Sequence, residues 1–173
     1  MSNRRWQKVT KNEPCLACGK RRALSEPELR RLLAKVPEDR RLVYLFAATS
    51  GLRRSELAEL RWYDVHLSAT KPFVQLRAEA TKARRADRVP LRQDMAEMLR
   101  ERRPADESAV VFANIPNIDV FKADLAAAGI VYMDAKGRQA DFHALRVSYA
   151  TMLAQGGVAP RVAMALMRHT DMR

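Results

Sequence analysis

Five polar side chains are expected at the edges of helices, strands or turns rather than on apolar faces. They are two arginines, one lysine and two histidines: Arg53, Arg146, Lys82, His143 and His169. Arginine stays charged at any working pH and can bind two phosphate oxygens at once. Histidine can relay a proton near neutrality, and lysine can protonate a departing 5′ oxygen. Such a set suits a phosphodiester whose pentacoordinate state needs fixed donors, but it contains no nucleophile.

The sequence offers neither paired carboxylates with metal-ligand spacing nor a glycine-rich phosphate loop. The sequence therefore argues against a metal-dependent nuclease. Cys15 and Cys18 form a lone Cys-x-x-Cys motif, whereas tetrahedral zinc needs four ligands. The two cysteines are either half of a zinc site that another chain completes or, more simply, two reduced surface thiols.

His143 and Arg146 open the stretch 141–158, DFHALRVSYATMLAQGGV, around which the chain is organised. Three residues make nearly one helical turn, so on a helix both side chains point to the same side. Apolar residues at helical spacing supply the side that faces the core: Leu145, Tyr149, Met152 and Leu153. We expect the imidazole and the guanidinium together at the front of this helix, within reach of one anion.

Arg53 follows a helix predicted at Glu38 to Ser50, which Gly51 ends. It lies in the turn before a short apolar helix that Ser55 can cap. This position would hold Arg53 on a backbone with little freedom. The simpler interpretation is a solvated arginine like its neighbour Arg54, and spacing alone does not separate the two.

A hairpin is predicted in the middle of the chain. Residues 73–78 alternate apolar and polar side chains, and residues 88–91 form a second extended run. The connector EATKARRAD places three basic residues at the tip: Lys82, Arg84 and Arg85. Such a tip could enter a DNA groove and its lysine could deliver a proton, although a solvated loop is the simpler interpretation.

Helical patterns account for most of the remaining chain. Ser25 and Glu28 form a capping box that opens the first helix, which Pro37 interrupts. Further helices are predicted at residues 92–103, at 121–128 and in APRVAMALMRH, whose apolar residues are expected to face inward: Val162, Leu166 and Met167. The total is about seven helices around one small hairpin, a mainly α fold with a small antiparallel sheet (α+β).

The chain of 173 residues fits one domain, and its formal charge of +12 attracts polyanions. Phosphate backbones are the commonest large partner of such a surface, although a ribosomal or membrane-surface role would also fit. Residues 1–22 are basic and poor in aliphatic side chains, so we expect a tail or linker followed by one domain at 23–173. There is neither a membrane span nor a signal peptide, so we expect no membrane partner and a cytoplasmic, nucleoid-associated location.

Four stretches in series resemble the signature blocks of the tyrosine recombinase (phage integrase) family: TSGLRRSELAELRWYDVHL, TKARRADRVPL, FHALRVSYATMLAQGGV and LMRHTDMR. The resemblance covers about residues 24 to 173. It implies that two arginines clamp a scissile phosphate, that the lysine is the general acid and that two histidines relay protons. These residues are Arg53, Arg146, Lys82, His143 and His169.

The same resemblance implies a mainly helical catalytic domain that needs no metal or nucleotide cofactor. It implies double-stranded DNA as the partner, bound in the family usually by a tetramer. Arg54, Arg84 and Arg85 are the basic neighbours that we assign to DNA binding. The function implied is site-specific recombination, in which DNA strands are cleaved and rejoined by transesterification.

The family's nucleophilic tyrosine normally lies several residues beyond the position of His169, and the sequence stops at Arg173. The four tyrosines present do not match that position: Tyr44, Tyr63, Tyr132 and Tyr149. We therefore expect a catalytic domain without its last segment, which binds DNA but does not form the covalent tyrosyl–phosphate bond. A shortened chain, a degraded gene and a chain completed in trans all fit this expectation.

Two other interpretations stay open. The chain could be a non-catalytic DNA-binding or regulatory module that kept the fold and lost the chemistry. Alternatively, it could be a basic helical domain that binds protein or RNA and matches the motifs by coincidence.

Overall fold

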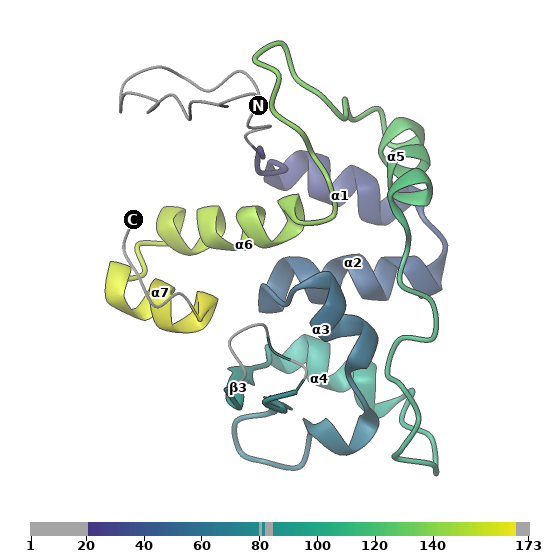
Figure 1. The fold of residues 1–173 in the computed structure, drawn as a ribbon, viewed down its shortest axis with the longest axis vertical. Helices are drawn as coiled ribbons and strands as arrows, with labels where there is room; N and C mark the ends of the chain where they lie inside the picture. The colour runs from purple at the N-terminus through teal and green to yellow at the C-terminus, as the bar shows by residue number, and fades with distance from the viewer. Residues whose placement is uncertain (1–20, 80, 82–84, 169–173) are drawn as a thin grey trace, which may run out of the picture.

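Seven α-helices and a three-stranded antiparallel sheet make up the part of the chain that the computed structural model describes, residues 21–79, 81 and 85–168 (Figure 1). This architecture confirms the predicted fold class, a mainly α protein with a small antiparallel sheet. Cys15, Cys18 and most of the predicted tail lie outside the described residues. No helix of the described part is long and apolar enough to cross a membrane.

The first two helices begin and end where local signals place them. α1 spans Glu26–Lys35, and its capping box pairs the Ser25 hydroxyl with the Glu28 backbone and the Glu28 carboxylate with the Ser25 backbone. α2 spans Glu38–Ser50 and ends at Gly51, which has a left-handed φ of 65°. A glycine adopts this conformation without the steric penalty that a Cβ brings.

The sheet follows α3 (Arg54–Glu59) and a single 3₁₀ turn, η1 (Trp62–Asp64). β2 (Phe73–Leu76) and β3 (Asp87–Pro90) form the predicted hairpin, with Val74 opposite Val89. β1 (Val65–His66) adds a third strand beside β2, which the sequence did not predict. The expected cap was also wrong, because α3 begins after Arg53 and not after Ser55.

Four helices complete the chain: α4 (Gln93–Arg100), α5 (Ile118–Ala127), α6 (Ala144–Gln155) and α7 (Pro160–Met167). In α7, Met167 is buried as predicted, but Val162 is 52% exposed, so its predicted inward orientation was wrong. Helical spacing identifies a face and does not say how far along the helix that face is covered.

The core is built around α2, which packs against α1 and α6 (Figure 1). Tyr44 and Phe46 of α2 are completely buried. Tyr44 also donates a 2.6 Å hydrogen bond to Asp124 of α5, whose carboxylate is bound by both the Nε and Nη2 of Arg40. These contacts hold α5 on α2. The candidate site forms elsewhere, where the C-terminal end of α2 meets the first turn of α6.

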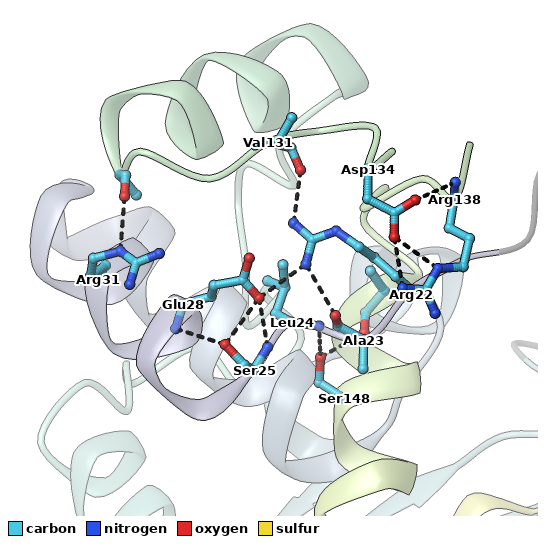
Figure 2. Close-up of polar contacts among 12 residues, drawn as sticks. Arg22, Ala23, Leu24, Ser25, Glu28, Arg31, Val131, Asp134, Arg138 and Ser148 are labelled. Carbon is cyan, nitrogen blue, oxygen red and sulfur yellow. Dashed lines mark hydrogen bonds and ion pairs between the residues drawn. The ribbon is translucent and has the colours of Figure 1, made fainter. Parts of the chain in front are cut away.

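The segment before α1 is bound to the start of α6 and to the loop that precedes it (Figure 2). Arg22 donates to the Val131 carbonyl at 2.8 Å and to the Glu28 carboxylate at 3.0 Å. The Leu24 amide donates to the Ser148 hydroxyl of α6 at 2.8 Å. Although Arg22 falls within the predicted tail, it is therefore bound to α1 and to the loop that precedes α6.

Candidate active site

Arg146 joins three elements at the centre of the site. Its side chain leaves the first turn of α6, and the residue is only 3% exposed. One terminal nitrogen donates to the carbonyl of Gly51 after α2, and the other to the carbonyl of Met167 at the end of α7. Desolvation, followed by the charges of Arg53 and Arg168, lowers the pKa of Arg146 to about 10, so the guanidinium stays charged at neutral pH.

Gly51 allows this close packing. A Cβ at this position would lie 2.6 Å from Cδ1 of Tyr149, on the next turn of α6 after Arg146. The left-handed φ of 65° independently disfavours any other residue. Gly51 therefore lets the end of α2 approach α6 closely enough for its carbonyl to bind Arg146.

Arg53 and Arg54, which spacing could not separate, have different partners. Arg53 precedes α3 on an extended backbone, and its Nη1 donates to the Glu56 carboxylate at 2.8 Å. Arg54 donates instead to the carbonyls of Pro116 and Ile115, at 3.1 and 3.3 Å. Arg54 thus connects α3 to the loop before α5. Arg53 instead belongs to a group of three arginines, Arg53, Arg146 and Arg168, which we call the arginine cluster.

Neither Arg168 of this cluster nor Glu56, which binds it, was predicted. The Glu56 side chain is completely buried, and its carboxylate binds Arg53 and, at 2.7 Å, Arg168. Burial raises the pKa of Glu56, but the bonds from Arg168 and Arg53 outweigh it, so the net pKa is lowered. The carboxylate therefore stays ionised at neutral pH. The spacing of Arg53 and Glu56 matches a helix capping pattern, which was the available signal for Glu56.

His143 lies at the position before α6 and is exposed. Its neighbour Asp141 forms an ion pair with Arg21 at 2.7 Å. Partial desolvation and the charge of Arg21 lower the pKa of His143, more than the opposing effect of Asp141. The ring is therefore neutral at pH 7. The charges of Arg146 and Arg53 also lower this pKa, which indicates that all three predicted residues share one electrostatic environment.

The remaining predicted residues lie at the hairpin tip and after α7. Lys82, Arg84 and His169 fall outside the described residues. Arg85 is exposed, and its amide donates to the Thr81 hydroxyl at 3.0 Å across the base of the tip. Its position at the tip is as predicted, whereas its role in binding remains a prediction.

The cluster carries an excess of positive charge. Three guanidinium groups, those of Arg53, Arg146 and Arg168, surround the single carboxylate of Glu56. Within the described part of the chain, no three His, Cys, Asp or Glu side chains gather as metal ligands would. Partly buried positive charge that exceeds its counter-charge is suited to binding an anion.

The chain is similar in sequence to known proteins. The model of the Phage integrase family matches residues 22–173. The tyrosine recombinase XerA of Pyrococcus furiosus is 26% identical over 160 residues, which cover 87% of this chain and 54% of XerA. The chain thus spans about half the length of that relative.

Two solved structures share the fold at lower identity. The catalytic domain of bacteriophage HP1 integrase superposes with a TM-score of 0.68 at 20% identity, over 88% of this chain and 83% of that domain. A lambda integrase dimer bound to a COC′ core site superposes with a TM-score of 0.67 at 19% identity, over 88% of this chain and 46% of that chain. At these identities the similarity establishes the fold.

Proposed function

This chain belongs to the phage integrase family, and we propose that it binds double-stranded DNA and holds one phosphodiester for metal-free cleavage and rejoining. The observation that carries this proposal is the buried arginine cluster with a single counter-charge. A duplex supplies one negative charge per phosphate, and a pentacoordinate phosphorus carries one more. The excess positive charge of the cluster is suited to both.

In this proposal Arg53 and Arg146 clamp the scissile phosphate. The oxygen of a tyrosine that is not one of the four in this sequence attacks phosphorus, the bond to the 5′ oxygen breaks, and Lys82 protonates that oxygen. His143 and His169 orient the phosphate and relay protons. Rejoining is the reverse reaction, in which the free 5′ hydroxyl attacks the tyrosyl phosphate. Arg84 and Arg85 at the hairpin tip, with Arg54, contribute further contacts to DNA.

We further propose that none of the four tyrosines in the sequence is the nucleophile. Tyr44 is completely buried and bonded to Asp124. The Tyr149 ring lies against Gly51, and burial raises the pKa of its hydroxyl. The ring of Tyr63 contacts Arg77 and the ring of Tyr132 contacts Lys122, two cations that do not belong to the arginine cluster.

A role limited to DNA binding is the second candidate function, and the environments of these tyrosines favour it. In that case the chain acts as a DNA-binding module derived from a recombinase. Lambda integrase forms a dimer on its core site, and we propose that this chain likewise works on DNA as an assembly of several copies.

An exogenous nucleophile separates the two functions. A duplex with a nick near the cleaved bond would be incubated with the chain in EDTA, with and without hydrogen peroxide. Cleavage proceeds if the peroxide anion attacks phosphorus and the 5′ oxygen leaves with a proton. We expect no covalent protein–DNA adduct, but peroxide-dependent cleavage that the Arg146→Met variant loses.

The other outcomes are equally informative. Intact DNA binding without any arginine-dependent cleavage would favour the binding module. An adduct that disappears in one of the four Tyr→Phe variants would identify that tyrosine as the nucleophile and overturn its exclusion.

A further inference from the structure

Arg168 ends α7 in a conformation that arginine rarely adopts. Its φ of 53° and ψ of 41° are left-handed, and it is the only residue other than glycine with positive φ in the described part of the chain. A side chain with a Cβ costs about 1–2 kcal/mol in this conformation, and glycine usually occupies it at helix ends. The contacts of the Arg168 side chain must therefore compensate for this backbone cost.

The Arg168 side chain is drawn into the site rather than into solvent. It is 7% exposed, and its Nη2 donates to Oε2 of Glu56 at 2.7 Å. Its Nε is buried and has no hydrogen-bond partner among the described residues. Both backbone strain and desolvation thus oppose this arrangement, and the ion pair with Glu56 is what holds it.

Glu56 divides its two carboxylate oxygens between two arginines. Oε1 accepts from Nη1 of Arg53 at 2.8 Å, and Oε2 accepts from Arg168 and from the Arg53 backbone amide. Arg168 is the more buried of the two cations, with its side chain 7% exposed against 32% for Arg53. Because a desolvated ion pair interacts more strongly, Arg168 stabilises the charged carboxylate of Glu56 more than the side chain of Arg53 does.

We propose that Arg168 is a positioning residue that neutralises Glu56 and so keeps the guanidinium of Arg53 available to a DNA phosphate. This inference rests on the proposed function. Without Arg168, Arg53 is the one ion-pair partner left to the buried carboxylate among the described residues. Arg53 would then turn both of its outer nitrogens toward Glu56, as arginine does in a bidentate pair, and would withdraw from the anion.

The test is a charge-rescue experiment on duplex DNA. Affinity would be measured at fixed salt by fluorescence anisotropy for the wild type, Arg168→Gln, Glu56→Gln and the double variant. Arg161→Gln is the matched control, because it removes the same charge from an exposed position of the same helix. Arg168→Gly is included because it removes the side chain while relieving the backbone, so a folded protein is available for measurement.

We expect Arg168→Gln and Arg168→Gly to weaken binding about tenfold, the effect of losing one charge-assisted bond from Arg53 to phosphate. Arg161→Gln should change affinity by about threefold or less. Adding Glu56→Gln to Arg168→Gln removes the carboxylate that captures Arg53, so we expect affinity to return to within about threefold of the wild type.

Each failure has a separate meaning. If the wild type does not bind duplex DNA, the proposed function fails. If the wild type binds but Arg168→Gln matches Arg161→Gln, the role of Arg168 is wrong. If the double variant stays as weak as Arg168→Gln, Arg168 acts on the phosphate directly or on the fold, and the charge-balancing role is overturned.

Discussion

Arg146 shows how one residue can support the fold and the site together. A guanidinium has five N–H donors, and the two hydrogen bonds to the carbonyls of Gly51 and Met167 use one donor on each terminal nitrogen. The other three donors do not bond to these two carbonyls. Arg146 can thus hold the ends of α2 and α7 together and still present donors to a phosphate.

The two roles of Arg146 predict a stability effect for a conservative change. Arg146→Lys keeps the charge, but an ammonium on a single nitrogen cannot reach two carbonyls as the planar fork does. We expect the free energy of unfolding, measured by urea denaturation, to fall by about 1–3 kcal/mol. Arg161→Lys on the exposed face should change it by less than about 0.5 kcal/mol. Equal effects in both variants would contradict the bridging role.

His143 predicts a pH dependence. Its pKa in the folded state is lower than in the unfolded state, because of desolvation and the charges around it: Arg21, Arg146 and Arg53, opposed by Asp141. Between the two pKa values the unfolded state binds more protons, so stability rises with pH. The contribution of His143 is therefore complete above pH ~6.5 and is lost as the pH falls toward the folded pKa.

Arg21 offers a direct check of this assignment. Arg21→Gln removes a positive neighbour, so we expect the pKa of His143, followed by NMR of the ring protons, to rise. Arg161→Gln removes the same charge from another position and should leave the pKa of His143 unchanged. A titration that Arg21→Gln does not move would show that the charge of Arg21 does not contribute to the lowered pKa of His143.

At the scale of elements, the site depends on how closely the end of α2 approaches α6. Gly51 and Gly129 both have φ of +65°, but a Cβ would clash with Tyr149 only at Gly51, since nothing lies within 4 Å of a Cβ at Gly129. The pair therefore separates backbone strain from packing.

We expect Gly51→Ala to lower the free energy of unfolding by about 2–4 kcal/mol, as the sum of left-handed strain and overpacking. Gly129→Ala should cost about 1 kcal/mol, from strain alone. Both values would come from urea denaturation. If the two variants are equally destabilised, the contact between Gly51 and Tyr149 is not tight, and the packing of α2 on α6 does not depend on it.

The elements that the sequence predicted correctly are those with local signals. The capping box before α1 and the left-handed glycine after α2 both depend on neighbouring residues. β1 has only two residues, too few for periodicity, and exists because β2 pairs with it. Ser55 was a plausible cap, but the Glu56 carboxylate accepts from the Arg53 amide and fixes the helix start there.

The site divides in the same way. Residue type and helical spacing selected His143 and Arg146 as candidates, whereas Arg53 was preferred to Arg54 only through the resemblance to the signature blocks. The catalytic roles of all three residues remain predictions. Arg168 was missed because its ion pair with Glu56 spans 112 residues and exists only in the folded chain. Glu56 had a local signal, its position three residues after Arg53, which was not used. Arg53 and Arg54 could not be separated because the carbonyls that bind Arg54, those of Pro116 and Ile115, lie 62 and 61 residues further along the chain.

At the scale of the whole molecule, the net charge of +12 should attract DNA broadly, whereas in the proposed function the arginine cluster binds one phosphate. Charge spread over the surface steers association and adds salt-dependent affinity without selecting a sequence. The two contributions can be separated, because each phosphate neutralised at the interface adds about 0.9 to the slope of log affinity against log salt.

Arg85 and Arg30 provide the matched pair for this measurement. Both are exposed, but Arg85 lies at the hairpin tip beside β3, whereas Arg30 lies on α1, toward the other end of the molecule's long axis (Figure 1). If the hairpin contacts DNA, Arg85→Gln should weaken duplex binding and reduce the salt slope by about 1. Arg30→Gln removes the same charge away from the interface and should leave the slope unchanged. Equal slopes in the two variants would remove Arg85 from the interface, and a wild-type affinity independent of salt would contradict DNA as the partner.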